Sequence, residues 1–334
     1  MTKNIVVSII IPCYNSESHL NRCIASILTS SYKEFELLIV NDGSTDNTKK
    51  VISKFKKENR IKIINLNNNI GPARARNIGV KKSTGKYLFF LDIDTEIFKD
   101  TLYKVVSFLN KNEHIGALSP MVLNKNLKTI DAVGHYLTPF GFPYEIGVGS
   151  FIKQYSKQKI IFGAKTAALV VPRAVFQKIG GFDRDYLIYG EDTDLCWRIW
   201  LSGKKVIYFS GARLVHYQKS SLTNSTRRRV YYEGSKNNLS NIIKNADVRI
   251  VVFMVPLYLL GWILISVKLF IKMDLSNFLL VYKGLFWNIV NLKRILKKRS
   301  HSRTNCYKIP TKILFGDINF TKLYRKGLVW LKNV

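Results

Sequence analysis

The segment KYLFFLDID (residues 86–94) joins a strand-like apolar run to two aspartates. In an extended strand, residues i and i+2 point to the same face, so Asp92 and Asp94 would both face one ligand. Two neighbouring carboxylates repel each other unless a cation lies between them, and hard divalent cations prefer such oxygen ligands. The alternative is a polar strand end whose two acids are simply solvated. We therefore expect a strand that ends in a candidate Mg²⁺ or Mn²⁺ site.

The same pattern recurs through the first two thirds of the chain. Apolar, β-rich runs alternate with polar, helix-like segments as far as about residue 215. The four runs are NIVVSIIIP, FELLIVND, IKIINL and KYLFFLD, and the helix-like segments cover residues 17–29, 45–58 and 72–84. Alternation of this kind predicts an α/β domain with a parallel sheet between helices. Such sheets bind ligands at the carboxyl ends of their strands, where polar clusters of this sequence also lie.

The amino-acid composition limits the classes of binding partner but does not select one of them. The 334 residues include 53 Lys and Arg against 22 Asp and Glu, a formal charge of +31. This excess predicts attraction to polyanions such as nucleic acid, anionic lipid or phosphorylated ligands. The four cysteines are widely scattered, with no C-x-x-C pair and no zinc spacing, so we expect reduced thiols. The first residues lack the basic segment, apolar core and cleavage site of a signal peptide, and we expect none.

Two further polar clusters indicate chemistry. A helix that opens at Gly71-Pro72 carries Arg74 and Arg76. Arginines at the mouth of a site suit phosphates, although a solvated basic face would give the same pattern. The segment GEDTDL (190–195) places three acids at the start of a helix. The helix dipole favours acids there, but a carboxylate is also the natural general base for activating a hydroxyl.

Six segments, taken in order, resemble the glycosyltransferases of family 2, and specifically the branch of rhamnosyltransferases of surface-polysaccharide assembly. They are VSIIIPCYN, VNDGSTD, GPARARNIG, LDID, GGFDRDYLIYGEDTDLCWRIWLSG and ARLVHYQKSS, within about residues 4–245. The resemblance implies a GT-A fold, in which a Rossmann-like nucleotide-binding half and an acceptor-binding half share one mixed central sheet. It also implies inverting transfer of a sugar from a nucleotide-diphosphate donor to a hydroxyl of a glycan or lipid-linked acceptor.

The resemblance assigns several residues to the donor. Pro12, Tyr14 and Asn15 would line the nucleoside pocket, and Asp42 would accept a hydrogen bond from the base. One of the two arginines of the helix that opens at Gly71-Pro72 would meet the ribose or the diphosphate. Which of the two does so stays open.

The resemblance also assigns the metal and the base. Asp92 and Asp94 match the D-x-D element of the family, with Asp94 as the direct metal ligand and Asp92 on the donor side. His216 would lie near the metal or diphosphate, although it could equally end the strand ARLVH. A divalent cation, Mn²⁺ or Mg²⁺, would stabilise the departing diphosphate. Asp192 would be the general base that deprotonates the acceptor hydroxyl.

On the acceptor side the resemblance places Gly181, Phe182 and Glu191. One feature of related enzymes is missing from this sequence. The processive synthases of the family, which make cellulose, chitin or hyaluronan, carry a Q-x-x-R-W element after the ED motif, and this sequence has none. We therefore expect transfer of single sugars rather than processive synthesis.

Other classes of protein remain as alternatives. A nucleotidyltransferase would share half of the fold and the metal aspartates, but it normally has a glycine-rich phosphate loop after the first strand, where this chain has IPCYNSESHL. A nucleic-acid-binding protein would explain the charge but not the grouped carboxylates, and we expect no nucleic-acid partner. A non-catalytic protein that binds polyanions or membranes is the last alternative.

The composition changes after residue 248, and we expect two parts: a GT-A domain at 1–248 and a tail at 249–334. The tail holds 16 Lys or Arg against 2 Asp, with an uncharged run at 250–267. A helix of 18 residues reaches about 27 Å, which is marginal for crossing a bilayer, and Pro256 and Gly261 interrupt it.

A second apolar stretch at 275–290 contains Lys283 and could lie in the membrane interface. We expect a peripheral or re-entrant anchor at the cytoplasmic face of the cell membrane, with a transmembrane hairpin or a pair of packed helices as alternatives. The neighbouring basic residues suit an anionic membrane surface and a polyprenyl-phosphate-linked acceptor.

Overall fold

The computed structural model describes residues 5–217, 224–303 and 306–316, and the chain divides into two compact units. The first unit is Met1–His135 with Glu145–Ser221, and the second is Tyr136–Tyr144 with Leu222–Val334. The expected parts, 1–248 and 249–334, stay a prediction. Within the second unit, helix α7 (Asn224–Asn245) packs on the helices that follow it, α9 (Leu275–Val290) and α10 (Leu292–Arg303).

The first unit is built on a mixed sheet, which confirms the expected fold class. Among the described residues it has ten strands, in the main order β10-β12-β6-β11-β4-β1-β2-β3, with β5 paired to β12 and β7 to β6. Strand β11 is antiparallel to both of its neighbours, whereas β1 is parallel to β2 and β4. The strands are β1 (Val7–Cys13), β2 (Phe35–Asp42), β3 (Ile61–Leu66), β4 (Tyr87–Leu91), β5 (Thr95–Ile97), β6 (Ile115–Asn124), β7 (Ile130–Ala132), β10 (Lys159–Ile160), β11 (Ala168–Pro172) and β12 (Lys205–His216).

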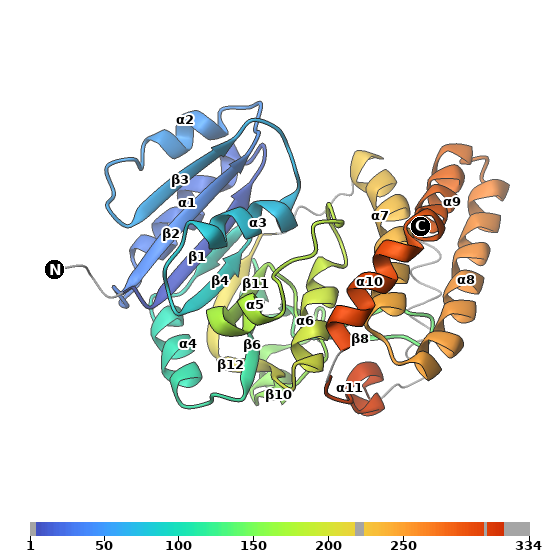
Figure 1. Ribbon diagram of the computed structural model, residues 1–334. Coiled ribbons are helices and arrows are strands. Elements are labelled where there is room, and N and C mark those ends of the chain that lie inside the picture. The colour runs from blue at the N-terminus through green and yellow to red at the C-terminus, as the bar shows by residue number, and fades with distance from the viewer. Residues whose placement is uncertain (1–4, 218–223, 304–305, 317–334) are drawn as a thin grey trace. The chain divides into compact units, whose positions relative to one another are not determined.

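Helices cover both faces of this sheet (Figure 1). The alternation of strand side chains explains how: Ile9 and Ile11 of β1 share one buried cluster with Leu20 of α1, whereas Ile10 lies against Gly79 of α3. On the first face lie α1 (Glu17–Leu28), α2 (Thr48–Ser53) and α4 (Thr101–Asn110), and on the second lie α3 (Pro72–Lys81), α5 (Arg173–Lys178) and α6 (Glu191–Leu201). A separate hairpin, β8 (Gly134–Leu137) with β9 (Pro143–Ile146), and the short helix η1 (Ile152–Tyr155) follow β7.

The second unit is mostly helical, and it also includes Tyr136–Tyr144 from the β8-β9 hairpin. Besides α7, α9 and α10 it contains α8 (Val248–Ile271) and α11 (Thr311–Phe315). Among the described residues, α8 alone is long and apolar enough to cross a membrane, and such a helix also occurs in the cores of soluble proteins. The apolar stretch expected at 275–290 is the helix α9.

Polar side chains lie inside this helical unit. Asn288 of α9 is buried, accepts a hydrogen bond from Ser240 at 2.6 Å and donates to the carbonyl of Lys236 at 3.0 Å. The hydroxyl of Ser235 donates to the carbonyl of Val281 at 3.1 Å. Conversely, many large apolar side chains of α8 and α9 are exposed, at positions 252, 253, 260, 263, 264, 267, 270, 279, 286, 289 and 290. The unit therefore buries polar as well as apolar side chains and is apolar over much of its exposed surface.

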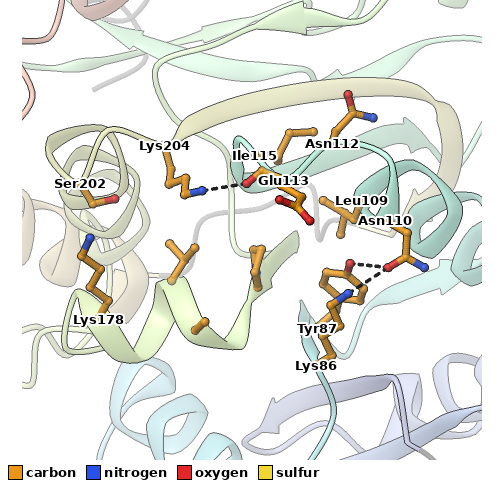
Figure 2. Close-up of a pocket in the computed structure, with 13 residues that line it drawn as sticks. Lys86, Tyr87, Leu109, Asn110, Asn112, Glu113, Ile115, Lys178, Ser202 and Lys204 are labelled. Atoms are coloured by element: carbon orange, nitrogen blue, oxygen red, sulfur yellow. Dashed lines mark hydrogen bonds between the residues drawn. The ribbon is translucent and has the colours of Figure 1, made fainter.

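A cavity of about 350 Å³ lies at the edge of the sheet where β4 and β6 begin (Figure 2). Tyr87 and Ile115, the first residues of these two strands, line it together with Lys86, Lys178 and Lys204. This edge is opposite to the one at which β4 and β12 end. The cavity is thus separate from the aspartate pair that the sequence singled out.

Candidate active site

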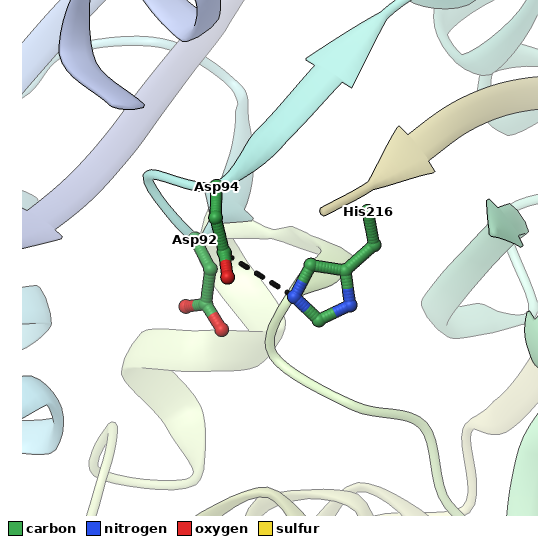
Figure 3. Close-up of side chains that lie close together, drawn as sticks. All are labelled: Asp92, Asp94 and His216. Carbon is green, nitrogen blue, oxygen red and sulfur yellow. Dashed lines mark ion pairs between the residues drawn. The ribbon is translucent and has the colours of Figure 1, made fainter. Parts of the chain in front are cut away.

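Asp92, Asp94 and His216 lie together at the carboxyl ends of β4 and β12 (Figure 3). One ligand atom from each of the three side chains lies within 4.8 Å of the others. Nε2 of His216 and Oδ1 of Asp94 are 3.2 Å apart. Asp92 therefore belongs to the same cluster as the two residues expected to hold a metal.

Strand pairing brings the histidine to the aspartates. Strand β12 runs antiparallel to β5, with His216 opposite Thr95, and the amide of Tyr217 donates to the carbonyl of Asp94 at 2.8 Å. The sequence pattern predicted that the two aspartates continue the alternation of the strand. In the structure they lie in the turn between β4 and β5. The amide and hydroxyl of Thr95 both donate to the carbonyl of Asp92 and close this turn. The turn, rather than strand alternation, thus brings the two carboxylates together.

The donor set fits a divalent cation. Carboxylate oxygens suit Mg²⁺ and Mn²⁺, and an imidazole nitrogen adds a ligand that transition metals accept. Burial disfavours the charged form of His216, but hydrogen bonds to Asp131 and Asp94 outweigh burial and raise its pKa to about 10. The carboxylates around the ring thus favour positive charge at this position, and a bound cation would replace the proton on Nε2 of His216.

Arg76 connects this cluster to the ED motif, the pair Glu191 and Asp192 at the start of α6. Its guanidinium lies 2.6 Å from Oδ1 of Asp92 and 3.3 Å from Oε1 of Glu191, and its side chain is only 2% exposed. Burial and repulsion from Asp192 raise the pKa of Glu191 to about 7, although Arg76 acts in the opposite direction. Nε of Arg76 and Oε2 of Glu191 are buried and have no hydrogen-bond partner among the described residues.

Asp192 lies in the first turn of α6, which follows Gly190 in a left-handed conformation. Its carboxylate is partly exposed and accepts a hydrogen bond from the amide of Thr193 at 2.7 Å. The hydroxyl of Thr193 lies 3.0 Å from Nε2 of His135. Burial lowers the pKa of His135, so its ring is neutral at pH 7. Asp192 is thus a carboxylate that reaches solvent on a supported helix end.

The third acid of the motif has a structural role. Asp194 is fully buried and accepts two hydrogen bonds from Arg198, at 2.6 and 2.9 Å. This pair lies within α6 itself, one helical turn apart. Of the three acids in residues 191–194, Glu191 and Asp192 therefore lie at the site and Asp194 lies in the core.

The expected nucleoside residues gather at the ends of β1 and β2. Tyr14 is 41% exposed, and Asn15 accepts a hydrogen bond from the amide of Thr45 at 2.9 Å, which joins the loops after the two strands. Pro12, near the end of β1, is partly exposed. Asp42 is 2% exposed, and its two oxygens accept hydrogen bonds at 2.9 Å from the amides of residues 70 and 71. Asp42 thus fixes the loop that opens α3, and burial raises the pKa of its carboxyl.

The two arginines of α3 differ in their surroundings. Arg74 is exposed and donates to the carbonyl of Arg184 at 2.7 Å, whereas Arg76 is buried against two acids. Gly181 has a φ of +72°. Phe182 next to it is buried against Phe90, so its ring belongs to the core.

Several residues that support the cluster carry no signal in the sequence. Asp131 of β7 lies 3.2 Å from Nδ1 of His216, and Lys165 lies 2.8 Å from Glu145 and 3.8 Å from Asp131. These residues come from short strands and loops between 125 and 165, where no periodic pattern or motif marks them. Only the fold brings them to the site.

The chain is similar to several known glycosyltransferases. Poly-beta-1,6-N-acetyl-D-glucosamine synthase of Staphylococcus epidermidis is 28% identical over 204 residues, which cover 60% of this chain and 47% of that protein. An uncharacterized glycosyltransferase of Rickettsia felis is 32% identical over 192 residues, which cover 54% of this chain and 32% of that protein. The chain thus matches less than half the length of these two relatives.

Solved structures share the fold. S. aureus TarS 1–349 in complex with UDP-GlcNAc has a TM-score of 0.57 at 17% identity and covers 97% of this chain and 92% of its own. The mannosyltransferase PcManGT from Pyrobaculum calidifontis, in complex with GDP-Man and Mn²⁺, has a TM-score of 0.56 at 17% identity and covers 95% and 89%. The sequence model described as Glycosyl transferase family 2 matches residues 8–180, more than half of the 334 residues, and the chain belongs to this family.

Proposed function

We propose that this protein transfers one sugar from a nucleotide-diphosphate donor to a hydroxyl of a glycan or lipid-linked acceptor, with inversion at the anomeric carbon. The observation that carries the proposal is the cluster of Asp92, Asp94 and His216, joined through Arg76 to the acidic start of α6. Metal ligands and a candidate base thus come from two connected elements at one edge of the sheet. Family membership supports this proposal, as do the GDP-Man and Mn²⁺ bound by the mannosyltransferase of similar fold.

Asp92, Asp94 and His216 would hold the divalent cation, with Mn²⁺ favoured over Mg²⁺ because of the imidazole ligand. When bound there, the cation would neutralise the charge of the departing diphosphate.

Asp192 acts as the general base in this proposal. Its carboxylate takes the proton from the acceptor hydroxyl as the hydroxyl oxygen bonds to the anomeric carbon. The bond between that carbon and the diphosphate oxygen breaks, and the nucleoside diphosphate leaves with the electron pair. Glu191, held by Arg76, and Thr193, in contact with His135, support the helix end that presents Asp192.

On the donor side, Tyr14 and Asn15 are proposed to border the nucleoside, with Pro12 beside them. Arg74 is the better candidate of the two arginines for the diphosphate, because Arg76 is already committed to Asp92 and Glu191. Asp42 contributes by fixing the loop before α3, whatever contact it makes with the base.

Transfer of a single sugar rests on the absence of a Q-x-x-R-W element after the ED motif. A rhamnosyl donor rests on the resemblance of the six sequence segments to rhamnosyltransferases, whereas the relative from S. epidermidis is named for a polymer of N-acetylglucosamine. A donor panel must therefore include both kinds of sugar.

We also place the protein at the cytoplasmic face of the cell membrane, through a peripheral or re-entrant anchor in the second unit. The exposed apolar side chains of α8 and α9 support contact with lipid. The basic helix α10, with sequence LKRILKKRSHSR, supports an anionic surface and suits an acceptor that carries a polyprenyl phosphate.

The experiment is donor turnover by the detergent-solubilised full chain. The donors are UDP-GlcNAc, GDP-mannose and nucleotide-activated rhamnose, each tested with Mn²⁺, Mg²⁺ or EDTA. The variants are Asp94→Ala, Asp192→Asn and, as a control, Glu113→Gln, which changes an exposed acid outside the cluster.

We expect turnover of one donor with metal only. Asp192→Asn should lose roughly 10²–10⁴ of the rate and still bind nucleotide, as expected for a general base. Asp94→Ala should lose activity together with metal dependence, and the control should match the wild type. With a polyprenyl-phosphate-linked glycan added as the acceptor, mass spectrometry should show one added sugar, and NMR of the product should show an inverted anomeric centre. Equal turnover in EDTA, or full activity of Asp192→Asn, would contradict the proposal.

A further inference from the structure

We propose that Asp131 is a positioning residue for the metal cluster: it orients the ring of His216 so that Nε2 faces Asp92 and Asp94. This inference rests on the proposed metal-dependent function and extends it to a residue that no sequence motif marks. Asp131 is the middle residue of β7, a three-residue strand that pairs with β6.

The geometry places the imidazole between two carboxylates. Nδ1 of His216 lies 3.2 Å from Oδ2 of Asp131, and Nε2 lies 3.2 Å from Oδ1 of Asp94. The two ring nitrogens therefore have different partners, one behind the cluster and one within it. Because Asp131 accepts a hydrogen bond from Nδ1, the lone pair of Nε2 is the one left for a cation.

Both side chains of this pair are buried, at 6% exposure for Asp131 and 9% for His216. A buried carboxylate requires compensation, and Lys165 supplies part of it from 3.8 Å. Lys165 in turn lies 2.8 Å from Glu145, whose side chain is 44% exposed. A row of charges thus runs from the surface through Lys165 and Asp131 to the histidine, and it holds Asp131 in place.

Strand pairing makes the arrangement rigid. β12 lies between β6 and β5, so that His216 pairs with Asn124 on one side and with Thr95 on the other. Asp131 comes from β7, which pairs with the same strand β6. The histidine, one of its aspartate partners and the turn that carries the metal aspartates are therefore tied to one sheet. A carboxylate fixed in this way can set the ring orientation before any cation binds.

The test measures Mn²⁺ affinity rather than activity. Free Mn²⁺ is followed by electron paramagnetic resonance during titration of the full chain in detergent, with nucleoside diphosphate present. The variants are Asp131→Ala, Asp131→Asn, His216→Ala and Asp94→Ala, with Glu113→Gln as the exposed control. Asparagine keeps an oxygen that can accept from Nδ1 but removes the charge. Thermal unfolding in EDTA records the stability of each variant without metal.

We expect Asp131→Ala to weaken Mn²⁺ binding about 10- to 100-fold, in the range known for groups that orient metal ligands. Asp131→Asn should recover part of the loss, which a purely structural role would not predict for variants that unfold alike in EDTA. The proposal is overturned if both Asp131 variants bind Mn²⁺ like the wild type while His216→Ala and Asp94→Ala bind weakly. If those two variants also bind normally, the cation is held elsewhere, and both the proposed metal site and this inference fail.

Discussion

The ion-pair partners of Arg76 come from distant parts of the sequence and are brought to it by the fold. The sequence indicates two arginines on one helix but leaves their roles open. In the structure, Arg76 contacts Glu191, which is 115 positions away, and Asp92, and it is 2% exposed. A pairing over that separation leaves no periodic or local signal in the sequence. The residue types of the site could be predicted, but their partners could not.

Replacing Arg76 by Met should lower the free energy of unfolding by about 3 kcal/mol, because it leaves buried Glu191 without its counter-charge. The matched variant is Arg74→Met, which removes only an exposed hydrogen bond and should change stability by less than about 0.5 kcal/mol. Chemical denaturation of both variants checks this. If Arg74 contacts the diphosphate, Arg74→Met should raise the KM for the donor without this loss of stability. Equal stability of the two variants would show that Arg76 is not a buried counter-ion.

At the scale of elements, the sequence predicted the first half of the sheet well. The four apolar runs are β1 to β4, and the segments at 17–29 and 72–84 contain α1 and α3. These elements have strong local patterns: buried runs, and a proline at the start of α3. The elements between β6 and β11 are short and irregular, so their contacts, including that of Asp131, depend on long-range pairing.

Two glycines of the helical unit should respond in opposite ways to the same change. A Cβ atom at Gly284 of α9 would lie within 2.5 Å of both the Ser235 hydroxyl and the Tyr232 carbonyl oxygen of α7. Gly284→Ala should therefore separate the helices and cost about 1–3 kcal/mol, as overpacking does. At Gly234 of α7 the nearest atom would be 3.7 Å away, in Trp262. Gly234→Ala should stabilise the helix, by up to about 1 kcal/mol.

Thermal unfolding in detergent, followed by circular dichroism, compares these two alanine variants. The expected result is a lower midpoint for Gly284→Ala and an unchanged or higher midpoint for Gly234→Ala. If both changes lower the midpoint equally, the close approach of α7 and α9 is not the reason that alanine is destabilising at Gly284. If neither does, the two helices tolerate a wider separation than their contacts indicate.

At the scale of the whole molecule, the two units differ in which side chains they bury and expose. The first unit buries apolar side chains between a sheet and helices, as a water-soluble domain does. The second keeps Ser240 and Asn288 inside and exposes large apolar side chains of α8. Interhelical polar contacts within an apolar exterior are typical of helices in lipid. The composition change in the sequence indicated a basic, apolar tail, but the polar contacts within it required the structure.

Charges on the exposed apolar surface of α8 should weaken binding to membranes. Replacing the exposed Ile263 and Leu264 of α8 together by Glu places two charges on the surface proposed to contact lipid. Because a charged side chain within the membrane costs roughly 2.5–3.5 kcal/mol, binding to anionic vesicles should fall at least tenfold. Activity in detergent should remain, since neither residue belongs to the proposed site. Vesicle flotation measures the binding.

Leu127→Glu is the control, because Leu127 is also an exposed leucine but lies in the first unit. This variant should bind vesicles like the wild type. High salt separates the two contributions: it weakens attraction between the basic residues and anionic lipid but leaves apolar insertion in place. If high salt alone releases the wild-type protein, or if the double variant still floats with the vesicles at high salt, α8 does not enter the membrane. The exposed apolar surface would then have to be covered by another protein surface.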